Sequence, residues 1–302
     1  MDARTRTLKV AVLGLGAMGL PMATRLASTL EVSAFDVMPE RIALAVQGGA
    51  HAATSAADAC RGADAVVIGV RNQEQFDASV FSEHGAAATL APGAVVVLTS
   101  TVGTDVVVDA AVRLQEHGID LLDAPVSGGA VRAAVGDLLI MVGGSEEVIA
   151  RAKPVLDLLA STLYVVGPRP GDGQTMKTVN QLLCGIHTAA AAEALALADS
   201  LGLDLDTVIE VLGSGAAASF MLADRGPRMI QQLRGEQPEL RSRLDVIGKD
   251  MGIVHDLVRT AHIAAPVAAA AEQTYLALEA RGYSSEDDSI AVTASAKDQG
   301  RA

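Results

Sequence analysis

Apolar residues in the first half of the chain gather in short runs that alternate with longer mixed stretches. The runs are rich in valine, leucine and alanine, which is typical of strands buried on both faces of a parallel sheet, and they lie at 8–13, 31–36, 65–70, 94–99, 120–124, 138–142 and 163–166. Helical spacing occupies three of the intervening stretches, 20–30, 39–47 and 104–117. This alternation predicts βαβ units and an α/β domain of the Rossmann type with a mainly parallel sheet.

The pattern changes at a segment rich in glycine and proline, residues 167–173, beyond which strand-like runs no longer occur. Residues 174–200 are apolar on nearly all sides and contain no proline, which predicts a buried core helix. Four more helices are expected at 206–212, 219–233, 245–261 and 266–281. We therefore predict two domains, a Rossmann-type domain at 1–168 and an all-α C-terminal domain at 169–302, and expect 293–302 to be a frayed tail.

A glycine triplet follows the first predicted strand and opens the first predicted helix, in the order Gly14-Leu15-Gly16-Ala17-Met18-Gly19. Strand, G-x-G-x-x-G and helix in this order indicate dinucleotide binding. The first glycine makes the tight turn, the second lets a pyrophosphate approach the backbone, and the third lets the helix pack on the strand. The helix N-terminus then faces the phosphates.

An acidic residue ends the second predicted strand, where a ribose-binding carboxylate is expected in such a domain. Asp36 accepts hydrogen bonds from ribose hydroxyls in this interpretation, and its charge repels a 2′-phosphate. The residues directly after it include no arginine that would hold that phosphate, and Arg41 is the nearest one. The sequence therefore favours NAD over NADP as the cofactor.

Composition and charge narrow the classes of partner. The chain has 302 residues, a formal net charge of −13 and no tryptophan, so we expect no nucleic-acid partner. No run of 18 or more residues is free of charged and turn residues, so no membrane segment is expected. The first residues lead straight into a strand and leave no room for a signal peptide, which favours the cytoplasm. The histidines and the two cysteines have no metal-ligand spacing, so no metal is expected.

Two further segments are candidates for chemistry. Only five of the 23 basic residues are lysines, and one of them, Lys177, stands near the start of the long apolar helix. Burial lowers the pKa of a lysine and suits it to proton transfer, although a lysine at a helix end can also extend to solvent. The turn Ser127-Gly128-Gly129 follows a strand and can present backbone N–H groups to a carboxylate, or it can be an ordinary loop.

These motifs together resemble the β-hydroxyacid dehydrogenase family, which includes 3-hydroxyisobutyrate dehydrogenase and tartronate semialdehyde reductase. The resemblance rests on four motifs in order, which are the triplet at Gly14, the segment 123–129, Gly171-x-Gly-x-x-x-Lys177-x-x-Asn180-Gln181, and Gly248-Lys249-Asp250. It covers residues 8–292. Within the family, the stretches 125–136, 181–187 and 286–292 resemble the subfamily that oxidises L-threonate most closely.

The resemblance implies an NAD(P)-dependent oxidoreductase that transfers a hydride between NAD and a small hydroxy acid. Lys177 matches the family's general acid/base, and Asn180 binds the same substrate oxygen or orients the lysine. Ser127, Gly128 and Gly129 match the residues that bind the substrate carboxylate. The other implied contacts are Gln181 with the substrate, although many members have asparagine there, and Lys249, Val70, Arg71, Thr101 and Phe220 with the cofactor.

Several alternatives stay open at this point. Lys249 can be a surface lysine paired with Asp250, and Asp287 with Asp288 can form a solvated loop or a segment that shields the substrate. The reaction can run as the reduction of tartronate or succinic semialdehyde, or as oxidation of 3-hydroxyisobutyrate. An imine reductase or a relative that binds a dinucleotide without catalysis would lack the lysine. The family also implies a homodimer or homotetramer that assembles through the helical domains.

Overall fold

The computed structural model describes residues 8–296, and the chain divides into two compact units, 1–177 and 178–302. We call these unit 1 and unit 2. The domain boundary predicted at residues 168 and 169 falls in the segment before the long helix α8 (Asp172–Ser200) and stays a prediction. α8 belongs to both units, because residues up to Lys177 group with unit 1 and the rest with unit 2.

Unit 1 contains the sheet, whose strand order is β3-β2-β1-β4-β5-β6-β8-β7, with β9 paired to β8. The strands from β1 to β6 are parallel to one another, and β8 is antiparallel to β6 and β7. The predicted mainly parallel sheet is therefore confirmed. The strands are β1 (Lys9–Leu13), β2 (Glu31–Phe35), β3 (His51–Ala52), β4 (Ala65–Ile68), β5 (Val95–Leu98), β6 (Asp120–Asp123), β7 (Val126–Ser127), β8 (Leu138–Gly143) and β9 (Ala160–Gly167).

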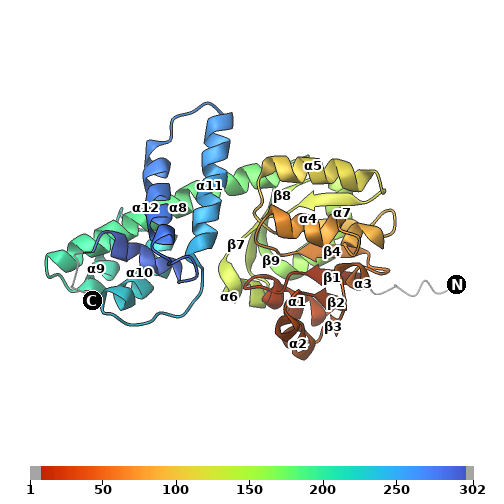
Figure 1. Cartoon of the computed structure of the whole chain (residues 1–302), viewed down its shortest axis with the longest axis horizontal. Coiled ribbons are helices and arrows are strands. Elements are labelled where there is room, and N and C mark those ends of the chain that lie inside the picture. Colours follow the sequence, from red (N-terminus) through yellow and green to blue (C-terminus); the bar gives the residue numbers. More distant parts are fainter. Residues whose placement is uncertain (1–7, 297–302) are drawn as a thin grey trace. The chain divides into compact units, whose positions relative to one another are not determined.

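Helices cover both faces of the sheet. Successive apolar side chains of the central strands point to opposite faces, so both faces are apolar and are covered. Val10 and Val12 of β1 pack with α1, α6 and α7, whereas Ala11 and Leu13 pack with α3, α4 and α5. Figure 1 shows α4 and α5 side by side, and Arg113 of α5 bonds Asp77 of α4 at 3.2 Å. The helices are α1 (Gly19–Ala27), α2 (Pro39–Gln47), α3 (Ala56–Ala59), α4 (Gln73–Phe81), η1 (Ala86–Ala88), α5 (Thr104–Gln115), α6 (Gly129–Val135) and α7 (Glu146–Leu159).

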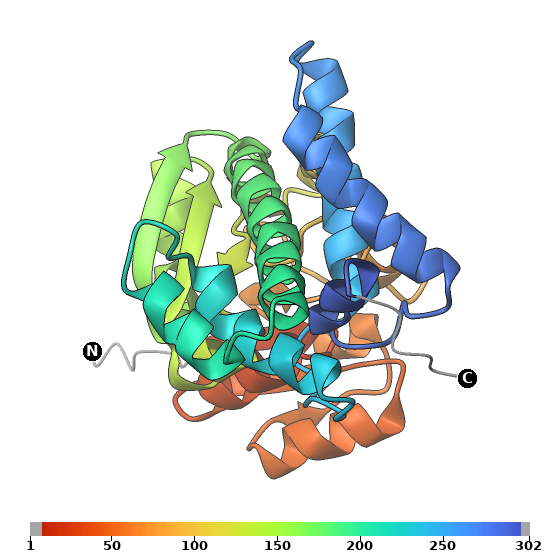
Figure 2. The same cartoon turned by 90° about the vertical axis from the view of Figure 1, so that its left-hand side faces the viewer.

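The elements of unit 2 in its described part are all helices, joined by loops, which confirms the predicted all-α C-terminal region. Its core gathers around the fully buried side chains of Leu195, Met229, Tyr275 and Leu278. Figure 2 shows α11 and α12 as adjacent helices in blue. After α8, the elements are α9 (Leu205–Gly213), α10 (Phe220–Leu233), α11 (Leu244–Thr260), α12 (Pro266–Ala280) and η2 (Asp288–Ala294).

The helix α8 is long and apolar enough to cross a membrane by length and composition alone. Its most apolar stretch has a mean hydropathy of 1.3, and 44% of that stretch is buried inside the protein. Charged residues interrupt α8, so the helix contains no uncharged run of 18 residues. The core helix of a soluble protein passes the same test, so this feature is weak evidence for a membrane segment.

Two expectations for the C-terminal segment are wrong. Asp287 and Asp288 do not form a solvated loop, because their exposed fractions are 3% and 0%. Part of the expected frayed tail belongs to η2, where the Thr293 hydroxyl donates to the carbonyl of Ile290 at 2.8 Å. The burial of the two carboxyls is accompanied by ion pairs with α10, from the half-buried Arg225 to Asp288 and from the buried Arg228 to Asp287. The rest of the predicted tail, 297–302, lies outside the described residues.

Candidate cofactor and substrate site

The glycine triplet joins β1 to α1, and the surroundings of its three glycines differ. Gly14 has φ +84°, and its N–H donates to the carbonyl of Phe35 at 3.0 Å. A Cβ at Gly19 would lie 1.8 Å from the carbonyl oxygen of Gly14, so only glycine lets α1 start there. A Cβ at Gly16 would meet nothing within 4 Å, which leaves this side open to a phosphate. The loop therefore fits a dinucleotide.

Asp36 follows β2 and holds the glycine loop from the side. Its two carboxylate oxygens accept from the backbone N–H of Leu15 at 2.6 Å and from that of Met38 at 2.9 Å. The side chain is half-buried, so part of the carboxylate faces solvent. The same carboxylate thus fixes the loop and remains accessible to hydroxyl donors, as the sequence-based role requires.

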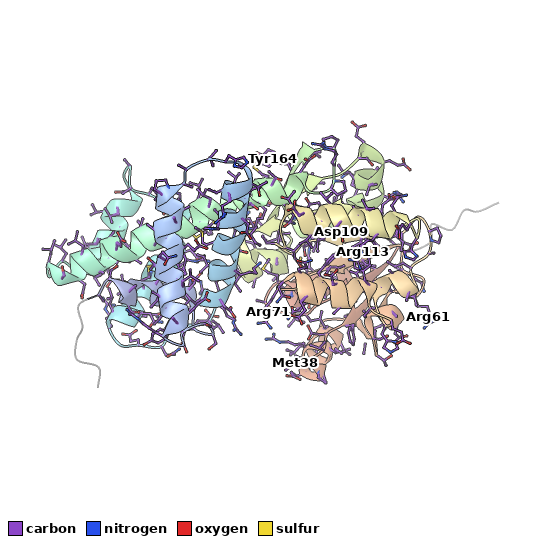
Figure 3. The ribbon with its side chains drawn as sticks, turned by 45° about the horizontal axis from the view of Figure 1, so that its top comes forward. Met38, Arg61, Arg71, Asp109, Arg113 and Tyr164 are labelled. Atoms are coloured by element: carbon purple, nitrogen blue, oxygen red, sulfur yellow. The ribbon has the colours of Figure 1, made fainter. Side chains whose placement is uncertain are left out.

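The carboxyl ends of β4 and β5 place three more predicted contacts near this loop. β4 and β5 are both parallel to β1 in one sheet, so their ends meet at the same edge. The Val70 N–H donates to the Ser100 hydroxyl at 2.8 Å, which ties the segments after β4 and β5 together. Arg71 is exposed, as is Met38 after β2, and Figure 3 labels both side chains. Thr101 is half-buried in the segment after β5.

The turn Ser127-Gly128-Gly129 connects β7 to α6 in unit 1. Gly128 has φ +137° and Gly129 has φ +75°, and both conformations disfavour residues with a side chain. A Cβ at Gly129 would meet nothing within 4 Å. Two successive backbone N–H groups at a helix start, beside a half-buried serine, form the kind of concavity that receives a carboxylate.

Lys177 lies in the second turn of α8 and is 7% exposed. It is therefore not a lysine that extends into solvent from a helix end. The two glycines before it, Gly171 and Gly173, are each required by the local backbone geometry. Gly171 has φ +99°, and a Cβ at Gly173 would lie 2.7 Å from the carbonyl oxygen of Met141. The spacing thus serves the close approach of α8 to the sheet.

Asp123 and Gln174 form a buried hydrogen-bonded pair to which the motifs alone assign no role. Both are 0% exposed, and the Gln174 Nε2 donates to Asp123 Oδ1 at 2.9 Å. Burial raises the pKa of Asp123 to about 6, although hydrogen bonds from Gln174, Gly171 and Gly173 oppose that shift. In the sequence, the position of each residue is the signal that could have identified the pair. Asp123 ends a strand, and Gln174 precedes Lys177 by one helical turn.

In unit 2, the predicted residues of α8 and α11 meet through side-chain hydrogen bonds. The Asn180 amide donates to Gln181 Oε1 at 2.8 Å, and Gln181 Nε2 donates to Asp250 Oδ2 at 2.5 Å. Lys249 and Asp250 form an ion pair at 2.9 Å, as one of the sequence interpretations anticipates. Phe220 begins α10 and is 60% exposed. Their predicted contacts with substrate and cofactor stay predictions.

No group of three or more His, Cys, Asp or Glu side chains suited to a metal ion occurs among residues 8–296. Cys60 is buried, and burial raises the pKa of its thiol to about 12. Such a thiol is inert at neutral pH.

Comparison with known proteins gives matches along nearly the whole chain. Residues 9–167 match the family model described as the NAD binding domain of 6-phosphogluconate dehydrogenase. Residues 171–295 match that described as NAD-binding of NADP-dependent 3-hydroxyisobutyrate dehydrogenase.

Individual relatives and a solved structure agree with these models. The L-threonate dehydrogenase of Pectobacterium atrosepticum is 37% identical over 96% of this chain and 94% of its own. The 2-(hydroxymethyl)glutarate dehydrogenase of Eubacterium barkeri is 32% identical over 95% and 94%. The crystal structure of 3-hydroxyisobutyrate dehydrogenase from Salmonella typhimurium has a TM-score of 0.87 and 37% identity, over 95% of this chain and 99% of that one. The chain therefore belongs to the β-hydroxyacid dehydrogenase family, the 3-hydroxyisobutyrate dehydrogenase-like NAD(P)-dependent oxidoreductases that act on CH–OH groups.

Proposed function

We propose that this protein oxidises L-threonate with NAD, and that Lys177 is the general base. The observation that carries the proposal is the buried position of Lys177 in unit 1, the unit that also contains the glycine loop and the turn at Ser127. The 37% identity with an L-threonate dehydrogenase over 96% of the chain supports the choice of substrate.

In this proposal Lys177, Asn180 and the turn at Ser127 have separate roles. NAD held by the glycine loop would supply the acceptor for the hydride of the carbinol carbon. The neutral amine of Lys177 takes the hydroxyl proton, so that the C–H and O–H bonds break and a carbonyl forms. Ser127 and the N–H groups of Gly128 and Gly129 hold the substrate carboxylate. Asn180, three residues after Lys177 on α8, orients the lysine or bonds the reacting oxygen.

The cofactor preference in this proposal depends on Asp36. Its carboxylate accepts hydrogen bonds from the ribose hydroxyls and repels the 2′-phosphate of NADP. Gly14, Gly16 and Gly19, with Leu15, Ala17 and Met18 between them, hold the pyrophosphate. Val70, Arg71, Thr101, Phe220 and Lys249 complete the contacts to the cofactor, and Gln181 contributes to the substrate pocket.

Assembly and location belong to the same proposal. Unit 2 leaves large apolar side chains exposed, including Leu197 at 61%, Val211 at 60% and Val267 at 60%. Burial of such side chains favours association, so we propose a cytoplasmic homodimer or homotetramer. Light scattering at micromolar concentration tests the assembly, and a monomer would contradict it.

The test of the reaction is NADH formation, followed by absorbance with purified protein, NAD or NADP, and a panel of acids. The panel contains L-threonate, D-threonate, D-glycerate, 4-hydroxybutyrate and 3-hydroxyisobutyrate; the last is included because the Salmonella structure is 37% identical. We expect turnover of L-threonate with NAD, and a loss of about 10²- to 10⁴-fold in kcat for Lys177→Ala. Full activity of Lys177→Ala would refute the proposed mechanism, and preference for another acid would replace the substrate.

A further inference from the structure

The Gln174 side chain joins three separate segments of unit 1. Its Oε1 accepts from the N–H of Val102 at 3.0 Å and from that of Gly103 at 3.2 Å. Its Nε2 donates to the carbonyl of Ser100 at 3.0 Å and to Asp123 Oδ1 at 2.9 Å. One fully buried amide therefore bonds the segment after β5, the end of β6 and, through its own backbone, the first turn of α8.

Asp123 holds the backbone of the same helical turn. Its Oδ2 accepts from the N–H of Gly171 at 3.0 Å and from that of Gln174 at 2.8 Å. These are N–H groups at a helix start, which have no partner within the helix and are satisfied here by a carboxylate. The backbone and the side chain of Gln174 are thus both fixed by Asp123.

The packing of this turn against the sheet is close. A Cβ at Gly173 would lie 2.9 Å from the carbonyl oxygen of Asp123, and one at Gly143 would lie 2.6 Å from the nitrogen of Gly173. The first turn of α8 therefore rests directly on the backbones of β6 and β8. A second contact outside the pair, between the hydroxyls of Thr104 and Thr175 at 3.1 Å, joins the same segments.

We propose that Gln174 and Asp123 are positioning residues for the reaction, which set the place of the Lys177 amine relative to the segment 100–103. Lys177 follows Gln174 by three residues, so the first turn of α8, which the pair fixes, lies directly before the turn from which the lysine projects. The segment 100–103 contains Thr101, a proposed cofactor contact. The inference rests on the proposed function, because it assigns the pair a purpose in proton transfer from the substrate.

The Gln174→Met variant tests this role, because methionine has a similar volume and removes all four side-chain hydrogen bonds. The matched control is Thr99→Val, which removes one buried hydrogen bond, from the Thr99 hydroxyl to the Ile68 carbonyl at 2.8 Å; this bond involves neither Gln174 nor Asp123. We expect Gln174→Met to lower kcat by about 10- to 100-fold, because small displacements of a reacting group have effects of that size. We also expect Gln174→Met to shift the pH profile of kcat, whereas Thr99→Val retains the wild-type kcat and the wild-type pH profile.

Hydrogen exchange on the holoenzyme supplies a readout that does not need turnover. We expect faster exchange in both 100–104 and 171–177 for Gln174→Met, and no change there for Thr99→Val. A purely structural role would lower the melting temperature of Gln174→Met while kcat of the folded enzyme and its pH profile stay unchanged.

The outcomes separate this inference from the proposed function. If wild type oxidises an acid, Lys177→Ala does not, and Gln174→Met keeps kcat within about twofold, the positioning role is wrong and the proposed function stands. If wild type oxidises no acid, the proposed function fails, and the positioning role for that reaction is overturned with it. Unchanged exchange in both segments would then show that the pair does not even hold them together.

Discussion

Both units bury charged side chains, but they surround them with different partners. In unit 1, the carboxyl of Asp123 accepts from neutral N–H groups of Gln174, Gly171 and Gly173, and burial raises its pKa to about 6. In unit 2, burial acts to raise the pKa of Asp287, but hydrogen bonds from Ser289, Arg228 and the backbone outweigh it and lower that pKa. Arg228 bonds Asp287 at 2.9 Å.

The difference teaches that burial of a charge does not by itself mark a reactive site. The buried carboxyls of unit 2 face guanidinium groups, since Arg225 also pairs with Asp288 at 3.0 Å and opposes the rise that burial causes in the pKa of Asp288. Asp287 accepts in addition from the backbone N–H of Arg241 and Ser242, so the cluster joins α10, the loop before α11 and η2. Unit 1 places a titrating carboxyl and a buried lysine near backbone groups that can receive a ligand. The first arrangement stabilises a fold, and the second can support proton transfer.

The largest expected effect concerns the glycines of unit 1. Gly19→Ala places a Cβ 1.8 Å from a carbonyl oxygen, so we expect loss of the folded loop, of NAD binding and of thermal stability. Gly16→Ala is the matched control, because its Cβ meets nothing within 4 Å, and we expect a normal melting temperature. NADH fluorescence titration should nevertheless show binding weakened by about tenfold or more, because the methyl group occupies the approach of the pyrophosphate.

The Gly16→Ala variant tests cofactor binding separately from folding. Wild-type affinity for NADH in Gly16→Ala would mean that the cofactor does not use this loop.

The second prediction concerns Arg228 in unit 2. Arg228→Met leaves Asp287 buried without its guanidinium partner, whereas Asp288 keeps Arg225, so we expect the free energy of unfolding to fall by roughly 3–5 kcal/mol. Urea unfolding measures this change. The kcat of the folded enzyme should stay unchanged, because we assign the cluster no part in the reaction.

Arg234→Met is the control for this variant. Arg234 caps the same helix, and its partner Asp206 is exposed, so we expect no measurable change in unfolding. A stable Arg228→Met protein with reduced kcat would reverse the assignment and place the cluster in the reaction.

The third and smallest effect is a pH dependence at Asp123. Its folded pKa of about 6 exceeds the ordinary 3.8, so its contribution to stability is fully present below about pH 3.8 and is lost as pH rises through about 6. Asp123→Asn does not titrate there. We therefore expect the wild type to lose roughly 3 kcal/mol of stability relative to the variant between about pH 4 and pH 7, by urea unfolding. A pH-independent difference between the two proteins would contradict the raised pKa.

The sequence predicts the elements of unit 1 best where local signals and burial agree. The helix expected at 39–47 is found as α2 (Pro39–Gln47), because proline is suited to the first turn of a helix. The hydrophobic pattern does not predict α7, which contains Pro154, or α4, in which only Phe76 and Val80 are buried. Periodicity thus predicts helices with a clear apolar stripe, including α10 with its internal Pro227, but it does not predict α4 or α7.

The candidate site divides in the same way. Motif spacing identifies the glycines and Lys177, because each answers a local need of the backbone or stands out by residue type. It does not identify the bond of Gln174 to Asp123, which are 51 residues apart, or the burial of Asp287 and Asp288. Those features depend on which segments the fold brings together, and a single sequence does not contain that pairing.

The most direct test of the central claim follows the hydrogen itself. The acid that the enzyme turns over is deuterated at every carbon that bears a hydroxyl, and the nicotinamide product is analysed by mass spectrometry. We predict that wild type transfers one deuterium to the cofactor, and that Lys177→Ala forms this product about 10²- to 10⁴-fold more slowly. A reduced cofactor without deuterium, or equal rates in the two proteins, would contradict hydride transfer assisted by Lys177.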